Sequence, residues 1–131
     1  MNIKKYAIAT IATFVFIFVF EWLWHGMLMK GMYEATKDVW RPEDPSLMGY
    51  IFASQFLFAA VLTYIYTLVG KYLPCKRGIA FGFFAGLLLA IPNLGVYAYM
   101  PIPLTIPLMW MLSMLVECLG AGMVIAAIYK E

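Results

Sequence analysis

Long runs of apolar residues alternate with short polar segments along the chain, and this pattern predicts the fold. The apolar runs cover roughly residues 6–28, 47–69, 78–99 and 104–128 of the 131. A helix rises about 1.5 Å per residue, so about 20 apolar residues cross the hydrocarbon core of a bilayer, which is about 30 Å thick. The pattern therefore predicts an all-α protein: a four-transmembrane-helix bundle that forms one integral-membrane domain over residues 1–131.

One polar segment, residues 30–46, separates the first two runs. Its apolar positions 32, 33, 36, 39 and 40, with Thr36 as a borderline member, follow the i, i+3, i+4, i+7 spacing of an amphipathic helix. We expect either a short external helix on the membrane surface that ends before Pro42, or an ordered loop held by Trp40 at the headgroup level. Ser46 is then expected to cap the second span, and Pro92 to break or kink the third.

Composition indicates a membrane protein rather than a soluble helical one. Hydrophobic residues make up 65% of the chain and charged residues 12%, whereas soluble domains average about 45–50% and about 25%. The net charge of +2 is too small to indicate nucleic acid as a partner. The expected partners are therefore the lipid bilayer and either a larger membrane complex or further copies of this chain in a homo-oligomer.

The basic residues are distributed unevenly, and they predict the orientation. They precede the first run, fill the turn between the second and third, and follow the fourth: Lys4, Lys5, Lys71, Lys76, Arg77 and Lys130. Residues 30–46 mix both signs of charge. Because cytoplasmic loops carry the excess of Lys and Arg, both termini are predicted to be cytoplasmic. Bulky Trp22 and Trp24 stand where a signal peptide has small residues, so an uncleaved first helix is expected.

Ionisable side chains inside the predicted spans are the first candidates for function, because burying them in a membrane is costly. Glu21 and His25 are four residues apart and share one helix face. Depth is counted from the outer end of each span at about 1.5 Å per residue. On this count, four polar residues lie about 5 to 12 Å deep: Glu21, His25, Gln55 and Asn93. We expect the four side chains to approach one another in one polar layer of the outer half.

This polar layer has three interpretations. Hydrogen bonds among its members would join the helices as a structural knot, as polar residues do in small bundles. The same groups would also suit a binding pocket or a proton-relay site reached from outside. A metal site is the third interpretation, with Glu21 and His25 as ligands, but zinc needs further ligands that neutral amides supply poorly.

Glu117 lies deeper, about 20 Å from the predicted outer face, among apolar neighbours. One interpretation is a protonated carboxyl that bonds to a backbone carbonyl. The other is a proton or cation site, by analogy with small four-helix exporters that use one acidic residue.

No cofactor is assigned from the sequence. The ten methionines include a group near the outer face, but no regular Met array accompanies a Cys or His pair as a copper site would need. One histidine cannot supply both axial ligands of a haem within one chain. Cys75 and Cys118 fall at different predicted depths, so no disulfide between them is expected, and Cys118 is interpreted as a small packing residue.

Small residues recur at four-residue spacing in the third span, at Gly78, Gly82 and Gly86, and the fourth span contains Gly120 and Gly122. Such stripes let helices approach closely. We expect them to pack helices within the bundle, with homodimerisation as the alternative.

The order of motifs resembles a group of known proteins. An early transmembrane histidine precedes VWRPED in the external segment, and YAYMPIPLTIPLMW follows before a Gly-rich last helix. With this pattern the chain resembles small bacterial four-helix membrane proteins of unknown function. The resemblance implies a multi-pass protein of the bacterial inner (cytoplasmic) membrane, and it supplies no activity and no functional residue.

No nucleophile–base pair, phosphate loop or nucleotide fingerprint occurs in the sequence, so no enzymatic activity is expected. The first expectation is a small non-catalytic membrane protein that acts as an accessory or structural subunit of a membrane assembly. The alternative is a small proton-coupled transporter, or a ligand- or metal-binding membrane protein, that uses the outer polar layer and Glu117.

Overall fold

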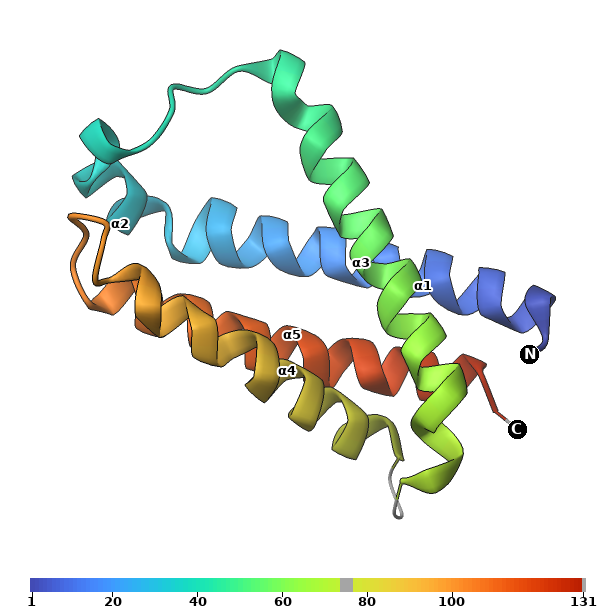
Figure 1. Cartoon of the computed structure of the whole chain (residues 1–131). Helices are drawn as coiled ribbons and strands as arrows, with labels where there is room; N and C mark the ends of the chain where they lie inside the picture. Colours follow the sequence, from blue (N-terminus) through green and yellow to red (C-terminus); the bar gives the residue numbers. More distant parts are fainter. Residues whose placement is uncertain (74–76, 131) are drawn as a thin grey trace.

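The computed structural model describes residues 1–73 and 77–130, and in these residues all regular structure is helical (Figure 1). The long helices are α1 (Ile3–Leu23), α3 (Met48–Val69), α4 (Arg77–Val96) and α5 (Thr105–Ile128). Short turns adjoin them: the π-helical η1 (Trp24–Leu28), the α-helical α2 (Lys30–Ala35), and the 3₁₀ turns η2 (Lys37–Val39), η3 (Pro45–Leu47) and η4 (Gly70–Tyr72).

Four helical segments are long and apolar enough to cross a membrane. Their bounds, with the adjoining turns, are Ile3–Leu28, Pro45–Tyr72, Arg77–Val96 and Thr105–Ile128. The predicted all-α, multi-pass fold is thereby confirmed. The third span ends at Val96 instead of residue 99, because residues 97–99 form a turn after α4.

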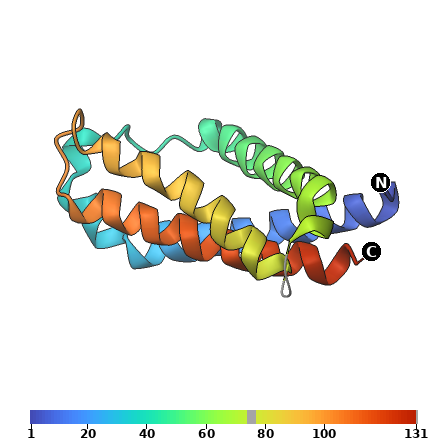
Figure 2. The ribbon, with the colours of Figure 1, turned by 60° about the horizontal axis from the view of Figure 1, so that its bottom comes forward.

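Both chain termini lie at one end of the molecule, and α2 lies at the other (Figure 1). We call these the termini end and the loop end. α4 and α5 lie side by side, and α1 lies against both α5 and α3 (Figures 1 and 2). Toward the loop end α3 departs from α4 and α5, so the bundle is open on that side.

Two clusters of buried side chains join the helices, one toward each end. Near the termini end the cluster draws on α3, α4, α5 and the residue after α5: Leu62, Tyr66, Phe81, Ala121, Ile125 and Tyr129. Near the loop end Met29 packs with Ile102 and Ile106, and the rings of Trp40 and Trp110 pack against them. The second cluster fastens the segment after α1 to the start of α5.

The glycine stripe of α4 is used inside this chain. A Cβ at Gly82 would overlap the backbone carbonyl of Cys118, and one at Gly78 would meet the carbonyl of Gly122. On the other side of α5, a Cβ at Gly120 would overlap the ring of Phe16 in α1. The expected packing role is therefore observed, and the homodimer alternative loses the α4 stripe because α5 already covers it.

The segment between α1 and α3 differs from the expected surface helix. It is divided into α2 and η2 at Thr36, whose hydroxyl donates to the Met32 carbonyl at 2.8 Å. The same hydroxyl accepts from Trp40 Nε1 at 2.8 Å. The apolar side chains of the segment between α1 and α3 pack on Met29 and Ile106 of the same chain. That apolar face is thus covered by protein.

Two local expectations change. Asp44, and not Ser46, caps the turn that begins the second span, because the Asp44 carboxylate accepts hydrogen bonds from the Ser46 N–H at 3.0 Å and from the Ser46 hydroxyl at 2.7 Å. Of the two alternatives expected for Pro92, the break is wrong, because α4 continues through Pro92 to Val96. Proline cannot donate to the preceding turn, but Pro92 lies near the end of the helix, where few further turns depend on it.

Candidate functional site

A π-helical turn shapes the end of α1. The Met29 N–H donates to the Trp24 carbonyl, five residues earlier, at 2.9 Å. Such a turn contains one residue more than an α-helical turn and is frequent at functional sites. Here it holds His25 and lets the chain reverse into α2, which returns Tyr33 to His25.

His25 is bonded on both sides of its ring. Its Nε2 lies 3.2 Å from Glu21 Oε2, one helical turn earlier. Its Nδ1 lies 2.6 Å from the hydroxyl of Tyr33. The Tyr33 hydroxyl in turn accepts from Trp110 Nε1 of α5 at 2.7 Å. One set of protons satisfies this series: Trp110 donates to Tyr33, Tyr33 to Nδ1, and the Nε2–H of a neutral His25 to the Glu21 carboxylate.

The series continues inward from Glu21 to Glu117. The two carboxyl groups are neighbours, close enough to share a hydrogen bond when one of them is protonated. Glu117 is only 1% exposed, and its Oε2 has no hydrogen-bond partner in the described structure. A hydrogen bond between two carboxyl groups requires at least one proton, and close carboxylates cannot both ionise at low cost. The pair is therefore a place where one proton can be held between two carboxyl groups.

The outward end of the series opens into a surface pocket of about 740 Å³ at the loop end. His25 and Tyr33 form part of its wall, and the remainder comes from η1, α2 and the residues after α2: Gly26, Lys30, Glu34, Lys37, Asp38, Trp40, Arg41, Pro42 and Glu43. Burial and the nearby Glu21 carboxylate raise the pKa of the Tyr33 hydroxyl above 10.0, and the hydrogen bond from Trp110 opposes that shift. Tyr33 is thus a neutral hydroxyl between the pocket and His25.

The other two members of the expected polar layer stand apart. Asn93 Nδ2 donates to the Leu89 carbonyl of its own helix at 3.1 Å, and in the described structure it makes no hydrogen bond to Glu21 or His25. Gln55 Oε1 is buried without a hydrogen-bond partner in the described residues. The structure thus joins Glu21, His25 and Glu117 and leaves out the two amides.

The depths that were counted along each helix do not predict correctly which of these residues lie next to one another. The count assumes that all helices begin at one level, whereas Ile102 and Ile106 pack on Met29, beyond the π turn. The start of α5 therefore extends past the end of α1, and Glu117 falls opposite Glu21. For the amides, the departure of α3 from α4 toward the loop end is not visible in the sequence.

Tyr33 and Trp110 are members of the site that sequence reasoning missed. The pattern places Tyr33 on the apolar side of the external segment and in the aromatic belt, and nothing in it indicates a bond to a residue eight positions earlier. Aromatic residues with a polar tip do find a hydrogen-bond partner when buried. This rule indicates that Tyr33 and Trp110 have hydrogen-bond partners, but it does not identify those partners.

Metal ligands are not grouped in the described residues. No cluster of three or more His, Cys, Asp and Glu side chains occurs there. Met29, near His25, is fully buried, and its sulfur lies 3.6 Å from the Tyr33 hydroxyl. Cys118 is a buried free thiol packed near Gly82, whereas Cys75 lies outside the described residues.

The observed arrangement is therefore a hydrogen-bonded series from a charged surface pocket to the partly exposed Glu21, which adjoins the buried carboxyl group of Glu117. Comparison of the chain with protein-family models, with curated proteins and with solved structures finds no match.

Proposed function

We propose that this protein is a small proton transporter in which the Glu21–Glu117 pair holds the transported proton. One observation carries the proposal: Glu117 adjoins Glu21, and hydrogen bonds continue from Glu21 through His25 to Tyr33 at the loop-end pocket. Carboxyl, imidazole and phenol groups at hydrogen-bond distance are the usual groups for proton transfer in proteins.

The state of Glu117 favours this function over a purely structural knot. A structural knot is stable when its polar groups are satisfied, because an unpaired buried group is costly. Glu117 Oε2 is buried and unpaired in the described structure. The hydroxyls of Thr10 and Thr13, on the buried face of α1 toward the termini end, are unpaired there as well. These groups supply proton acceptors beyond the pair.

An accessory subunit remains a second proposal, and one observation favours it. The loop-end half of α3 contacts α1 through ring pairs such as Phe18 with Phe52, while α4 and α5 lie away from it. A helix of a larger assembly would fit beside it. The glycine stripe and the amphipathic segment do not add support for this role, because the chain packs both against itself.

The test is proton movement in liposomes that contain the purified protein and an internal pH-sensitive dye. An imposed potassium diffusion potential should drive proton entry faster than in protein-free liposomes. Glu117→Gln removes the buried proton site and should abolish the difference. Glu21→Gln should also abolish the difference in proton entry, because it interrupts proton transfer between Glu117 and His25.

Asn93→Leu provides the matched control, since Asn93 is an intramembrane polar residue outside the series. It should leave proton entry unchanged. Equal proton entry in the wild type, Glu117→Gln and protein-free liposomes would sink the proposal. Large subunits that co-purify in native mass spectrometry would then support the accessory role.

A further inference from the structure

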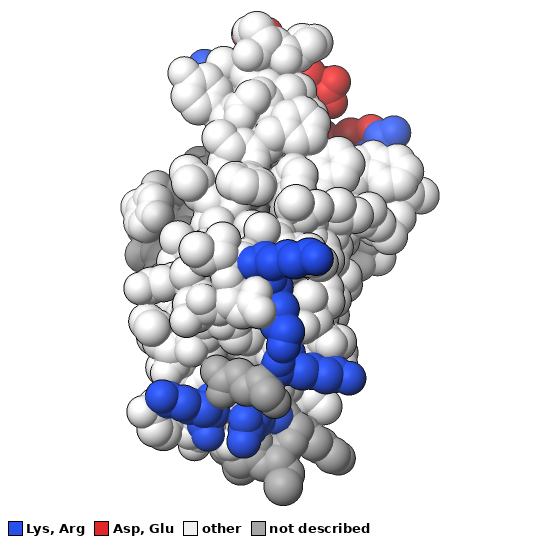
Figure 3. Space-filling model, turned by 90° about the vertical axis from the view of Figure 1, so that its right-hand side faces the viewer, with Lys and Arg blue, Asp and Glu red and all other residues white. Residues whose placement is uncertain are grey.

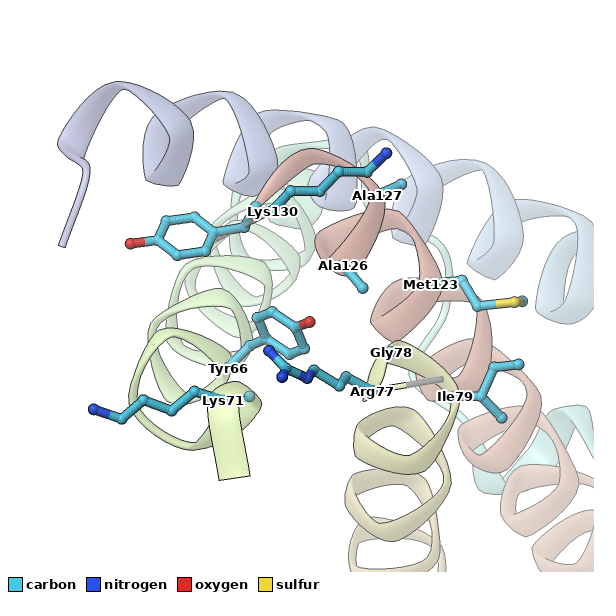
Figure 4. Close-up of a pocket in the computed structure, with 11 residues that line it drawn as sticks. Tyr66, Lys71, Arg77, Gly78, Ile79, Met123, Ala126, Ala127 and Lys130 are labelled. Carbon is cyan, nitrogen blue, oxygen red and sulfur yellow. The ribbon is translucent and has the colours of Figure 1, made fainter. Parts of the chain in front are cut away.

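A second pocket lies at the opposite end of the molecule from the polar series. It has a volume of about 630 Å³ and lies where η4 and the ends of α4 and α5 meet (Figure 4). Its wall is formed mainly by Tyr66, Gly70, Lys71, Arg77, Gly78, Ile79, Met123, Ala126, Ala127, Tyr129 and Lys130.

Three cationic side chains from three separate segments meet at this pocket. Arg77 extends across it toward the ring of Tyr66, and the ammonium groups of Lys71 and Lys130 point outward on either side (Figure 4). Lys5 adds a further positive charge, because its Nζ donates to the Lys130 carbonyl at 2.6 Å. The long lysine stems are flexible, so both ammonium groups can turn inward to an anion.

No acidic side chain balances these cations in the described residues. The described acidic residues are Glu21, Glu34, Asp38, Glu43, Asp44 and Glu117, and none of them lines this pocket. The face of the molecule at the termini end is accordingly basic, with acidic groups only at its far edge (Figure 3). The pocket therefore attracts a negatively charged ligand.

The remainder of the wall is apolar and belongs to the membrane-spanning helices. Ile79 is in the first turn of α4, and Met123 and Ala127 are in the last turns of α5. Met123 is 50% exposed and Ile79 43% exposed, so both present apolar surface outward. One pocket thus combines cations at the end of the spans with an apolar wall that continues into the hydrocarbon region.

We propose that this pocket binds an anionic phospholipid, with the phosphate among Arg77, Lys71 and Lys130 and an acyl chain along Ile79 and Met123. Arginine presents paired donors that match phosphate oxygens, and basic pockets between membrane helices suit anionic headgroups. The first backbone N–H groups of α4 also lack partners within the helix and favour an anion there. Free phosphate shares the headgroup chemistry but makes no use of the apolar wall.

Native mass spectrometry of the purified protein tests the site with phosphatidylglycerol and phosphatidylcholine of identical acyl chains. Phosphatidylglycerol should remain bound and phosphatidylcholine should be lost. Arg77→Gln should weaken phosphatidylglycerol binding about fivefold, and Lys71→Gln, Arg77→Gln and Lys130→Gln combined should weaken it on the order of 100-fold. Ala127→Phe keeps every charge but fills the apolar wall, and it should weaken binding as well.

Lys4→Gln is the matched control, because Lys4 is exposed at the same end but does not line the pocket. It should change binding by less than about twofold, as expected for a diffuse surface charge. Equal binding of the two lipids, equal effects of Lys4→Gln and Arg77→Gln, or no effect of the combined variant would each overturn the proposal. Displacement of the lipid by inorganic phosphate would assign the pocket to free phosphate and overturn it too.

Discussion

At the scale of single residues, the Tyr33 hydroxyl is the point on which the polar series depends. It meets His25 at 2.6 Å and Trp110 at 2.7 Å, and so connects η1, α2 and α5. The ring of Tyr33 also stacks on His25, with 6.0 Å between centroids. This one oxygen atom therefore links the pocket to His25 through a hydrogen bond and also holds α2 in its position.

Tyr33→Phe removes that oxygen and leaves the Trp110 N–H and His25 Nδ1 without their partner. Both groups are partly buried, and each of the two hydrogen bonds contributes about 0.5–1.5 kcal/mol, so the thermal unfolding midpoint in detergent should fall. Tyr50→Phe is the control, because Tyr50 is 77% exposed and its hydroxyl should contribute little. Equal unfolding midpoints for Tyr33→Phe and Tyr50→Phe would show that the Tyr33 bonds add no stability.

Alkaline titration tests the surroundings of Tyr33 separately. Burial and the Glu21 charge hold its pKa above 10.0 in the folded protein, so folding favours the neutral hydroxyl. In the unfolded chain the hydroxyl ionises near pH 10, so raising the pH through and beyond 10.0 favours unfolding until the folded-state pKa is passed. The ultraviolet tyrosinate difference between wild type and Tyr33→Phe should therefore appear only above pH 10.0. A difference centred at lower pH would contradict the buried environment.

At the scale of helices, close approach is set by glycine. α4 and α5 meet where Gly78, Gly82 and Gly86 face Gly122, Cys118 and Leu115. Lipid offers no hydrophobic force to join two apolar helices, so the van der Waals attraction between closely packed backbones holds them together. The closeness of this helix pair therefore depends on the absence of side chains.

Gly82→Ala should force α4 and α5 apart, because its Cβ would overlap the Cys118 backbone, which cannot rotate away. Overpacking of this kind costs about 1–3 kcal/mol. Gly95→Ala is the matched control in the same helix, since a Cβ at Gly95 meets nothing within 4 Å. The unfolding midpoint should fall for the first variant and not for the second. An unchanged midpoint for Gly82→Ala would mean that the interface is looser than described.

The sequence predicts such helices well and their mutual placement poorly. Apolar length alone located the four spans, and glycine spacing indicated the close contact of α4. The Glu21–His25 pair followed from helical periodicity. The Glu21–Glu117 contact could not be predicted from the sequence, because it depends on how far α5 extends past α1. Tyr33 reaches His25 only because of the π turn, which has no simple sequence pattern.

At the scale of the whole molecule, the two ends differ in charge. The termini end gathers cations around a pocket, and the loop end mixes both signs around another. The positive-inside rule predicts that the termini end faces the cytoplasm. The polar series would then open to the opposite side, and the proposed lipid would come from the cytoplasmic leaflet.

Labelling of Cys75 tests this orientation, because the sequence places it in the basic segment between α3 and α4. A membrane-impermeant maleimide added to intact cells should not react, and it should react once the membrane is made permeable. Cys75→Ser should remove the signal, since Cys118 is buried. Reaction in intact cells would invert the predicted topology.

The buried position of Glu117 has an electrical consequence. It lies 12 residues after Thr105, about 18 Å along α5 at about 1.5 Å per residue, in a hydrocarbon layer about 30 Å thick. A proton that reaches it from the loop end has crossed about half of the transmembrane field. Crossing the full field does about 2.3 kcal/mol of work per 100 mV, so occupancy of this site would change with voltage by about 1 kcal/mol per 100 mV. The same carboxyl that stores a proton would thereby sense the membrane potential.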